Sequence, residues 1–289
     1  MLLGLSSSLN HESPEQWAEK MSDIGARAVV FPVDHTAGEN TIDAYKNAAE
    51  KNNLVIAEVG VWKNTLAADL SEREKWIDYA VNQLRMADYI GARCCVNVVG
   101  TPCGPRWDGG YRGNFSKEIW NEAVKMIQKI IDTASPKRTK YSIESMPWMI
   151  PTGPDEYLRL MEDVGRSEFG AHLDVVNMIT SPRRYFFNDD FLNECFEKLS
   201  GKICSCHLKD IHLAEEYTFR LEEVACGKGS LDLKLYAELA TKEDKDMPMI
   251  IEHLDTDEQY LESLKYVQNL LREPLKTSVF RGNSENAMF

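Results

Sequence analysis

Short apolar runs rich in β-branched residues alternate with longer amphipathic stretches along most of the chain. The short runs predict strands, and the longer stretches carry the spacing of apolar positions that is typical of helices. The predicted strands cover residues 2–8, 26–34, 54–62, 92–100, 139–147, 169–177, 202–210 and 247–254.

A helix is predicted after each of these strands. Ser13 followed by Pro14, Ser71 and Ser116 each stand where an N-cap is expected before an amphipathic stretch. The spacing of apolar residues predicts the other helices at 40–52, 153–164, 188–200, 232–242 and 257–272.

Strands that alternate with helices in this way are parallel, because each helix carries the chain back across the sheet. Eight such units predict a closed (β/α)₈ TIM barrel, an α/β fold, as a single domain over residues 1–272. A polar tail follows at 273–289. No Gly-x-Gly-x-x-Gly motif follows a predicted strand, which argues against a dinucleotide site.

The net negative charge argues against a nucleic-acid partner. The chain has 33 Lys and Arg against 46 Asp and Glu, a formal charge of −13. Nucleic-acid binding needs clustered basic residues, so we expect no nucleic-acid partner. No apolar run is long enough to span a membrane, and the first residues lack the positive region of a signal peptide. We therefore expect a cytoplasmic protein that does not bind membranes and that forms an oligomer.

The cysteines do not form a metal-binding framework. There are seven; Cys94 and Cys95 are adjacent, and Cys204 and Cys206 are separated by one residue. Zinc sites commonly use wider spacings. We expect buried thiols in a reducing compartment.

Four predicted strands, the fifth to the eighth, each carry one ionisable residue near the carboxyl end: Glu144, Asp174, His207 and Glu252. In such a barrel these ends open onto the loops where chemistry takes place. Three buried carboxylates repel one another unless a cation compensates them. Oxygen-rich ligation with one imidazole suits a divalent metal, Mn²⁺ first, with Mg²⁺, Co²⁺, Fe²⁺ or Zn²⁺ as alternatives. Each acid taken singly is better explained as a structural ion pair; the four together, on successive strands, favour the metal site.

The alternation of side chains along a strand sorts the neighbours of these four residues. Ser205 and Ile203 are expected to point inward with His207, and Cys204 and Cys206 toward the helices. His253 is expected to face away from the site and pack.

Two further residues share a face with the candidate ligands. His172 stands two residues before Asp174, where it could orient substrate or support a ligand. Lys209 stands two residues after His207, where an electrophilic or phosphate-binding role competes with a solvated salt bridge.

Together, the glutamate of the fifth strand, His172-x-Asp174, the segment 207–210 (His-Leu-Lys-Asp) and Glu252 resemble the xylose isomerase-like barrel superfamily. The segment 225–232 is similar to the glycine-rich loop of those proteins. The resemblance implies that Glu144, Asp174, His207 and Glu252 hold one divalent metal. It also implies that Glu144 and Glu252 are catalytic and move protons beside a carbonyl, and which of them acts first stays open.

The chain departs from the ketose 3-epimerases of this superfamily at three positions. Asn177, Leu213 and Ile150 stand where those enzymes have a substrate-binding histidine, an arginine and a further glutamate. A free small ketose is therefore a doubtful substrate, and Asn177 becomes a substrate-binding candidate of a different kind.

The segments 146–157, 176–179 and 183–186 are similar to the catalytic barrel subunit of bacterial C-glycoside deglycosidases. That resemblance implies a small β-sandwich second subunit and elimination of the aglycone from a 3-keto glycoside. Trp148 would then face a bulky aglycone, or it would simply pack its loop. Arg106 and Trp107 are expected to line the mouth or to form a surface loop, and His35 and Glu58 are weaker candidates for hydroxyl contacts.

Three readings of function follow. The first is a metal-dependent sugar isomerase or epimerase that abstracts a proton next to a carbonyl. The second is the catalytic subunit of a C-glycoside deglycosidase, a lyase. The third is a non-enzymatic sugar-binding barrel, in which the four residues form a structural metal site or an ion-pair network.

Overall fold

Eight parallel strands close into a barrel in this computed structural model, which describes residues 1–272. The order around the barrel is β1-β10-β7-β6-β5-β4-β3-β2. The strands are β1 (Leu2–Leu5), β2 (Ala28–Val30), β3 (Val55–Gly60), β4 (Cys94–Asn97), β5 (Lys140–Glu144), β6 (Phe169–Leu173), β7 (Ile203–Leu208) and β10 (Pro248–Ile251). Each lies inside its predicted range, so the (β/α)₈ barrel is confirmed. The tail expected at 273–289 lies outside the described residues.

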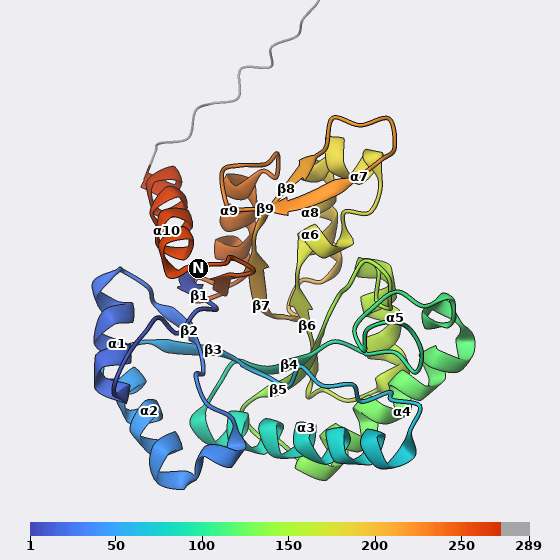
Figure 1. Ribbon diagram of the computed structural model, residues 1–289, viewed down its shortest axis with the longest axis horizontal. Helices are drawn as coiled ribbons and strands as arrows, with labels where there is room; N and C mark the ends of the chain where they lie inside the picture. Colours follow the sequence, from blue (N-terminus) through green and yellow to red (C-terminus); the bar gives the residue numbers. More distant parts are fainter. Residues whose placement is uncertain (273–289) are drawn as a thin grey trace, which may run out of the picture.

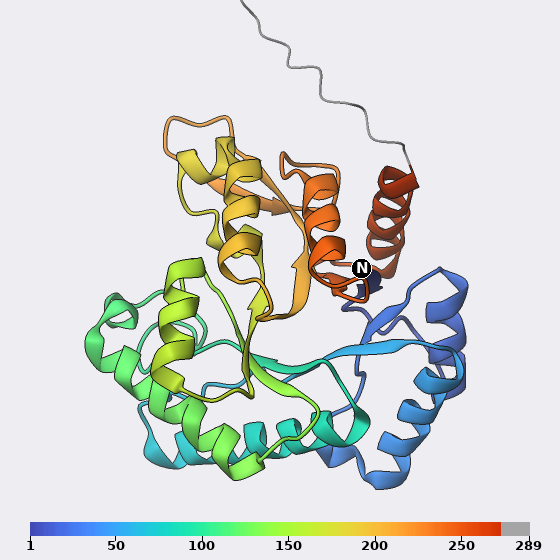
Figure 2. The ribbon, with the colours of Figure 1, turned by 180° about the vertical axis from the view of Figure 1, so that it is seen from behind.

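Helices surround the barrel, as both ribbon views show (Figures 1 and 2). They are α1 (Pro14–Asp23), α2 (Glu39–Lys51), α3 (Leu70–Ile90), α4 (Lys117–Ala134), α5 (Pro154–Val164), α8 (Asn188–Lys198), α9 (Leu233–Glu243) and α10 (Asp257–Arg272). Their apolar faces and the outward side chains of the strands form the two large core clusters. Within residues 1–272, no helix combines the length and apolar character that a membrane span requires.

Two of the three predicted N-cap residues are confirmed, and the third is wrong. Ser13 and Ser116 cap α1 and α4, accepting hydrogen bonds from the backbone N–H groups three residues on. The cap of α3 is Asp69, so the expectation of Ser71 there is wrong. The carboxylate of Asp69 accepts the N–H of Glu72, and the helix begins at Leu70.

Short helices and a hairpin follow some of the strands at their carboxyl ends. The short helices α6 (Val175–Met178) and α7 (Pro182–Phe186) follow β6, and 3₁₀ turns occupy 35–37 and 112–115. After β7 the chain forms an antiparallel hairpin, β8 (Asp210–Leu213) and β9 (Leu221–Val224), which lies beside α7 (Figure 1). The sequence pattern does not predict these elements, which build one side of the barrel mouth.

An extra residue in β7 reverses the alternation of its side chains. The pairing with β6 passes from Ile203 directly to Ser205, so Cys204 is a β-bulge. Cys204 packs against Cys94 and Val96 of β4. Because β4 and β7 are not neighbours, this contact crosses the barrel interior.

The bulge overturns two expectations. Ile203 belongs to the outer cluster that faces the helices, whereas Cys204 points inward. Cys206 is in the outer cluster, as expected, and Ser205 and His207 are fully buried. Six of the seven cysteines are buried thiols as predicted, and Cys103 is exposed.

A second bulge lies in β3. Its pairing with β2 passes from Ile56 to Glu58, so Ala57 is the extra residue. Ala57 packs inside with Ala28 and Ile250, and Glu58 also turns toward the barrel axis. The two bulges thus direct Glu58 and His207 toward each other.

Candidate active site

The four predicted ligands meet at the carboxyl ends of β5, β6, β7 and β10. Glu144, Asp174, His207 and Glu252 are buried, and one nitrogen or oxygen atom of each lies within 4.8 Å of those of the others. His207 Nδ1 lies 2.9 Å from Glu252 Oε2, 3.3 Å from Glu144 Oε1 and 3.8 Å from Asp174 Oδ2. The structure therefore brings together all four residues that the sequence singled out.

Two atoms of this cluster lack the partners that buried polar atoms normally have. His207 Nδ1 makes no aligned hydrogen bond, although it lies 2.9 Å from Glu252 Oε2. Asp174 Oδ2 makes no aligned hydrogen bond either, although it lies 2.7 Å from the ammonium of Lys209. Both atoms face the other carboxylates, and three carboxylates with one imidazole form the donor set of a divalent cation. The residues present therefore fit such a metal.

Glu58 supports the imidazole from behind. Its Oε1 lies 3.2 Å from His207 Nε2, and its Oε2 lies 2.5 Å from His172 Nε2. An ionised carboxylate only accepts hydrogen bonds, so both imidazoles donate from Nε2. With a metal bound, the neutral His207 would carry its lone pair on Nδ1, toward the cluster. This is how proteins commonly orient a metal-binding histidine.

Charge interactions give the buried carboxylates of the metal-free protein different pKa values. Burial opposes ionisation of Glu58, but His207 and His172 hold its pKa well below the usual range. Burial, together with repulsion from Glu252, raises the pKa of Glu144, despite the attraction of His207. Burial alone would raise the pKa of Glu252, but the charges of His207 and Lys209 lower it. The two glutamates proposed to move protons therefore differ in proton affinity.

Lys209 is not the solvated lysine that one reading allowed. It is buried, and its Nζ lies 2.7 Å from both Asp174 Oδ2 and Glu252 Oε1 and 3.3 Å from Glu223 Oε2. Burial disfavours the charged amine, but Asp174 and Glu252 raise its pKa well above the ordinary value. Lys209 thus neutralises part of the cluster and does not line the cavity described next.

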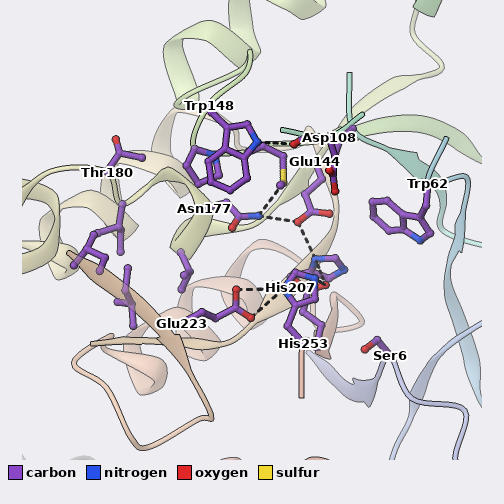
Figure 3. A pocket seen from close by; sticks show the side chains of 18 of the residues that line it. Ser6, Trp62, Asp108, Glu144, Trp148, Asn177, Thr180, His207, Glu223 and His253 are labelled. Carbon is purple, nitrogen blue, oxygen red and sulfur yellow. Dashed lines mark hydrogen bonds and ion pairs between the residues drawn. The ribbon is translucent and has the colours of Figure 1, made fainter. Parts of the chain in front are cut away.

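A cavity of about 910 Å³ opens above the cluster (Figure 3). Its floor contains Glu58, Glu144, His207 and Glu252. Its walls are mostly apolar, and these wall residues are Val30, Trp62, Val98, Trp107, Met146, Pro147, Trp148, Val176, Ile179, Ile211, Phe219 and Leu221. The site therefore combines an acidic floor with apolar, partly aromatic walls.

Three mouth residues expected from the sequence line this cavity: Arg106, Trp107 and Trp148. The Trp148 indole N–H donates to the carbonyl of Asp108 at 2.5 Å. Arg106 makes an ion pair with the same Asp108 at 2.8 Å. The loops that follow β4 and β5 are thereby joined at the rim.

The remaining substrate-binding candidates contact the ligands more than the cavity. Asn177 lines the cavity, but its Nδ2 donates to Glu144 Oε1 at 2.9 Å. His172 is fully buried and lies against Glu58, outside the cavity lining, so the structure does not support substrate contact there. His35 contacts Gln83 and does not line the cavity.

The side chain of His253 points toward the cavity, which is opposite to the direction expected from the sequence. It was expected to pack away from the site, but its side chain is 54 % exposed and lines the cavity. Strand β10 ends at Ile251, and His253 adopts a left-handed φ of 57°, so the alternation of the strand no longer applies. Its Nδ1 lies 3.0 Å from Glu223 Oε1 of the hairpin. No signal in the sequence indicated this turn or the role of Glu223.

The glycine-rich loop at 225–232 surrounds a carboxylate of the protein itself. Asp210 accepts hydrogen bonds from the backbone N–H groups of Ile211, Gly227, Gly229 and Leu231. A Cβ at Gly229 would lie 2.3 Å from the Ile211 carbonyl oxygen, so a larger residue does not fit. These N–H groups bind Asp210 and so fasten the loop beside the hairpin.

Solved structures with the same fold include several sugar epimerases. A D-psicose 3-epimerase from Clostridium cellulolyticum H10, solved with D-tagatose, shares 10 % identity over 94 % of this chain and 98 % of its own, with a TM-score of 0.69. A 3-keto-D-glucoside 4-epimerase from E. coli shares 13 % identity over 93 % and 99 %, with a TM-score of 0.65. A xylose isomerase-like barrel protein from Mycobacterium smegmatis, in complex with magnesium, shares 16 % over 89 % and 87 %, with a TM-score of 0.66.

No curated protein matches the sequence. The family model described as "Xylose isomerase-like TIM barrel" matches residues 18–270, which is most of the chain. The chain belongs to the xylose isomerase-like TIM barrel family.

Proposed function

We propose that this protein is a metal-dependent carbohydrate enzyme that moves a proton next to a carbonyl group. The observation that carries the proposal is the convergence of Glu144 and Glu252 with Asp174 and His207 on the floor of one open cavity. The epimerases of keto sugars among the solved structures with this fold also support it.

The metal, with Mn²⁺ as the first expectation, would be held by Glu144, Asp174, His207 and Glu252 and would polarise the substrate carbonyl. Each glutamate is also fixed through one oxygen by another side chain. Asn177 donates to Glu144 Oε1, and Lys209 donates to Glu252 Oε1. Held in this way, one carboxylate removes the proton beside the carbonyl and the other returns a proton to the enediolate, which gives an epimer or an isomer.

A second candidate is lyase-type deglycosylation of a 3-keto glycoside. The apolar walls above the acidic floor favour it, because a free sugar carries hydroxyl groups that such walls leave unpaired. The same proton abstraction then ends in expulsion of the aglycone. This candidate includes the small β-sandwich second subunit and assembly as an oligomer.

Proton NMR in D₂O distinguishes the candidates. The protein is loaded with Mn²⁺, incubated with a free ketose or a 3-keto glycoside, and the metal is removed before spectra are recorded. Deuterium next to the carbonyl of an intact sugar supports the epimerase or isomerase. Release of the aglycone without exchange in free ketoses supports the lyase. Sugar binding with neither reaction, also in the presence of a co-purified second subunit, supports the non-enzymatic barrel and contradicts the proposal.

A further inference from the structure

Trp62 stands in the cavity wall in a conformation that few tryptophans adopt. It follows β3, lines the cavity and is 38 % exposed. Its φ of 48° lies in the left-handed region, which is unfavourable for a bulky residue. Such outliers persist where the surroundings fix the backbone, and they gather at binding sites.

The backbone on both sides of Trp62 is fixed by β4. The N–H of Val61 donates to the carbonyl of Val96 at 2.8 Å. The buried side chain of Asn97 accepts the N–H of Lys63 at 3.2 Å and donates to the carbonyl of Lys63 at 3.0 Å. These three hydrogen bonds hold the turn that presents the indole to the cavity.

A glycine makes room for this indole. A Cβ placed on Gly60 would lie 2.0 Å from Trp62 Nε1 and 2.6 Å from its Cδ1. Even alanine at position 60 would therefore displace the ring. The φ of Gly60 is not in the left-handed region, so its glycine is needed for space alone.

Trp148 is held on the other side of Glu144, as Figure 3 shows. Its indole N–H is bound to the carbonyl of Asp108, and its own carbonyl accepts Nδ2 of the buried Asn114 at 3.0 Å. Its side chain is 39 % exposed. Two indoles are thus fixed in the wall before any ligand binds.

Between the two tryptophans the wall carries apolar side chains beside the ion pair of Arg106 and Asp108. In the barrel, β4 lies between β3 and β5, and the cavity residues after β4 and β5 include Val98, Met146 and Pro147. These side chains offer no hydrogen bonds to hydroxyl groups. Fixed indoles bind flat ring systems well, because little side-chain freedom is lost on stacking.

We propose that Trp62 and Trp148 bound a subsite for a planar, weakly polar ring, and that Trp62, through the space left by Gly60, sets the preference for that ring. The proposal rests on the proposed function only in placing the carbonyl end of the substrate at the acidic floor. The ring is then the part of the substrate that extends from the floor toward the mouth.

The test is a pair of sugar ligands that differ only in the ring. Binding of 4-nitrophenyl β-D-glucopyranoside and of methyl β-D-glucopyranoside to the Mn²⁺-loaded protein is measured by isothermal titration calorimetry. We expect the aryl glycoside to bind about tenfold more tightly. Trp62→Ala and Gly60→Ala should each reduce that ratio to about twofold or less, and Trp62→Phe should keep most of it.

Trp76→Phe serves as the control, because Trp76 is on α3 and is absent from the cavity lining. Thermal unfolding of every variant verifies that it folds. No aryl preference in the wild-type protein, or a preference that survives both Trp62→Ala and Gly60→Ala, overturns the proposal. Deuterium exchange in a sugar without an aryl group tests the proposed function separately, so either idea can fail while the other stands.

Discussion

Glu58 on β3 reaches across the barrel to His207 on β7, with 3.2 Å between Oε1 and Nε2. The two strands are not neighbours, so this contact is made through the interior. It fixes which nitrogen of His207 carries the proton and leaves Nδ1 for a metal.

Replacing Glu58 by glutamine should therefore weaken metal binding. A glutamine side chain both donates and accepts, so it no longer dictates the tautomer of His207. We expect Glu58→Gln to raise the dissociation constant for Mn²⁺ about 10- to 100-fold, measured by electron paramagnetic resonance of free Mn²⁺. Glu162→Gln, on the exposed side of α5, is the matched control. Unchanged affinity would show that Glu58 is only structural.

The two glutamates on the floor should both be needed for proton transfer. We expect Glu144→Gln and Glu252→Gln each to slow deuterium exchange next to the carbonyl by about 10²- to 10⁴-fold, because each removes a proton-transfer group. The measurement is the NMR exchange rate at saturating Mn²⁺, so that weaker metal binding does not contribute. A variant that retains the wild-type rate would remove that glutamate from the mechanism.

The pH dependence of stability should separate Glu144 from Glu58 in the metal-free protein. The folded-state pKa of Glu144 is raised, so its stabilisation is present below the reference value of 4.5 and is lost as the pH rises through the higher folded value. The folded-state pKa of Glu58 is lowered, so its stabilisation is present above 4.5 and is lost as the pH falls through the lower folded value.

Urea unfolding in EDTA over a range of pH tests both signs. Relative to wild type, Glu144→Gln should gain stability as the pH rises above 4.5. The stability deficit of Glu58→Gln should shrink as the pH falls below 4.5. Parallel pH profiles for wild type and both variants would contradict this account.

Lys209 and a metal should compensate the same buried charges. Lys209→Met leaves Asp174 and Glu252 without the ammonium, and breaking a buried ion pair costs about 3–5 kcal/mol. We expect the metal-free variant to unfold at a clearly lower temperature and saturating Mn²⁺ to restore part of the loss. Lys198→Met removes a solvent-screened ion pair and should lower the unfolding temperature much less. Equal losses in the two variants would be the contrary result.

Asp210 should hold the hairpin and the glycine-rich loop together. Asp210→Ala leaves four backbone N–H groups without their acceptor, and each unsatisfied buried group costs about 1–3 kcal/mol. Allowing for water at the more exposed groups, we expect a loss of about 3 kcal/mol or more in urea unfolding. Asp232→Ala, which removes only the cap of α9, should cost about 1 kcal/mol. A loss no larger than that would show that the loop holds without Asp210.

The barrel and the four floor residues could be predicted because both depend on local patterns. Strand runs, helix spacing and the place of an acid near a strand end are all visible in the sequence, as for Glu144 and Glu252. The hairpin that carries Glu223 was missed because its strands are four residues long and partly exposed, with no clear alternation. Such elements form through tertiary contacts, which a local pattern does not record.

Side-chain direction was predictable only where strands are regular. The inward positions of Glu144, Asp174 and Glu252 follow simple alternation. The direction of the His253 side chain could not be predicted. Its left-handed backbone is set by the turn after the end of β10 and not by the type of residue at this position. Glu58 was assigned to substrate hydroxyls because its partners, His172 and His207, come from distant parts of the chain.

The bulge at Cys204 allows Ile203 and His207, which stand an even number of residues apart, to face opposite sides of β7. Deleting this one thiol-bearing residue would leave every ligand of the candidate metal site in the sequence and the length of the barrel nearly unchanged. His207 would still face the barrel interior, because Ile203, which faces outward, would then stand an odd number of residues from it, and such positions lie on opposite faces of a regular strand. A relative that keeps all four ligand residues and lacks only the bulge residue is therefore expected to keep its histidine directed at the site.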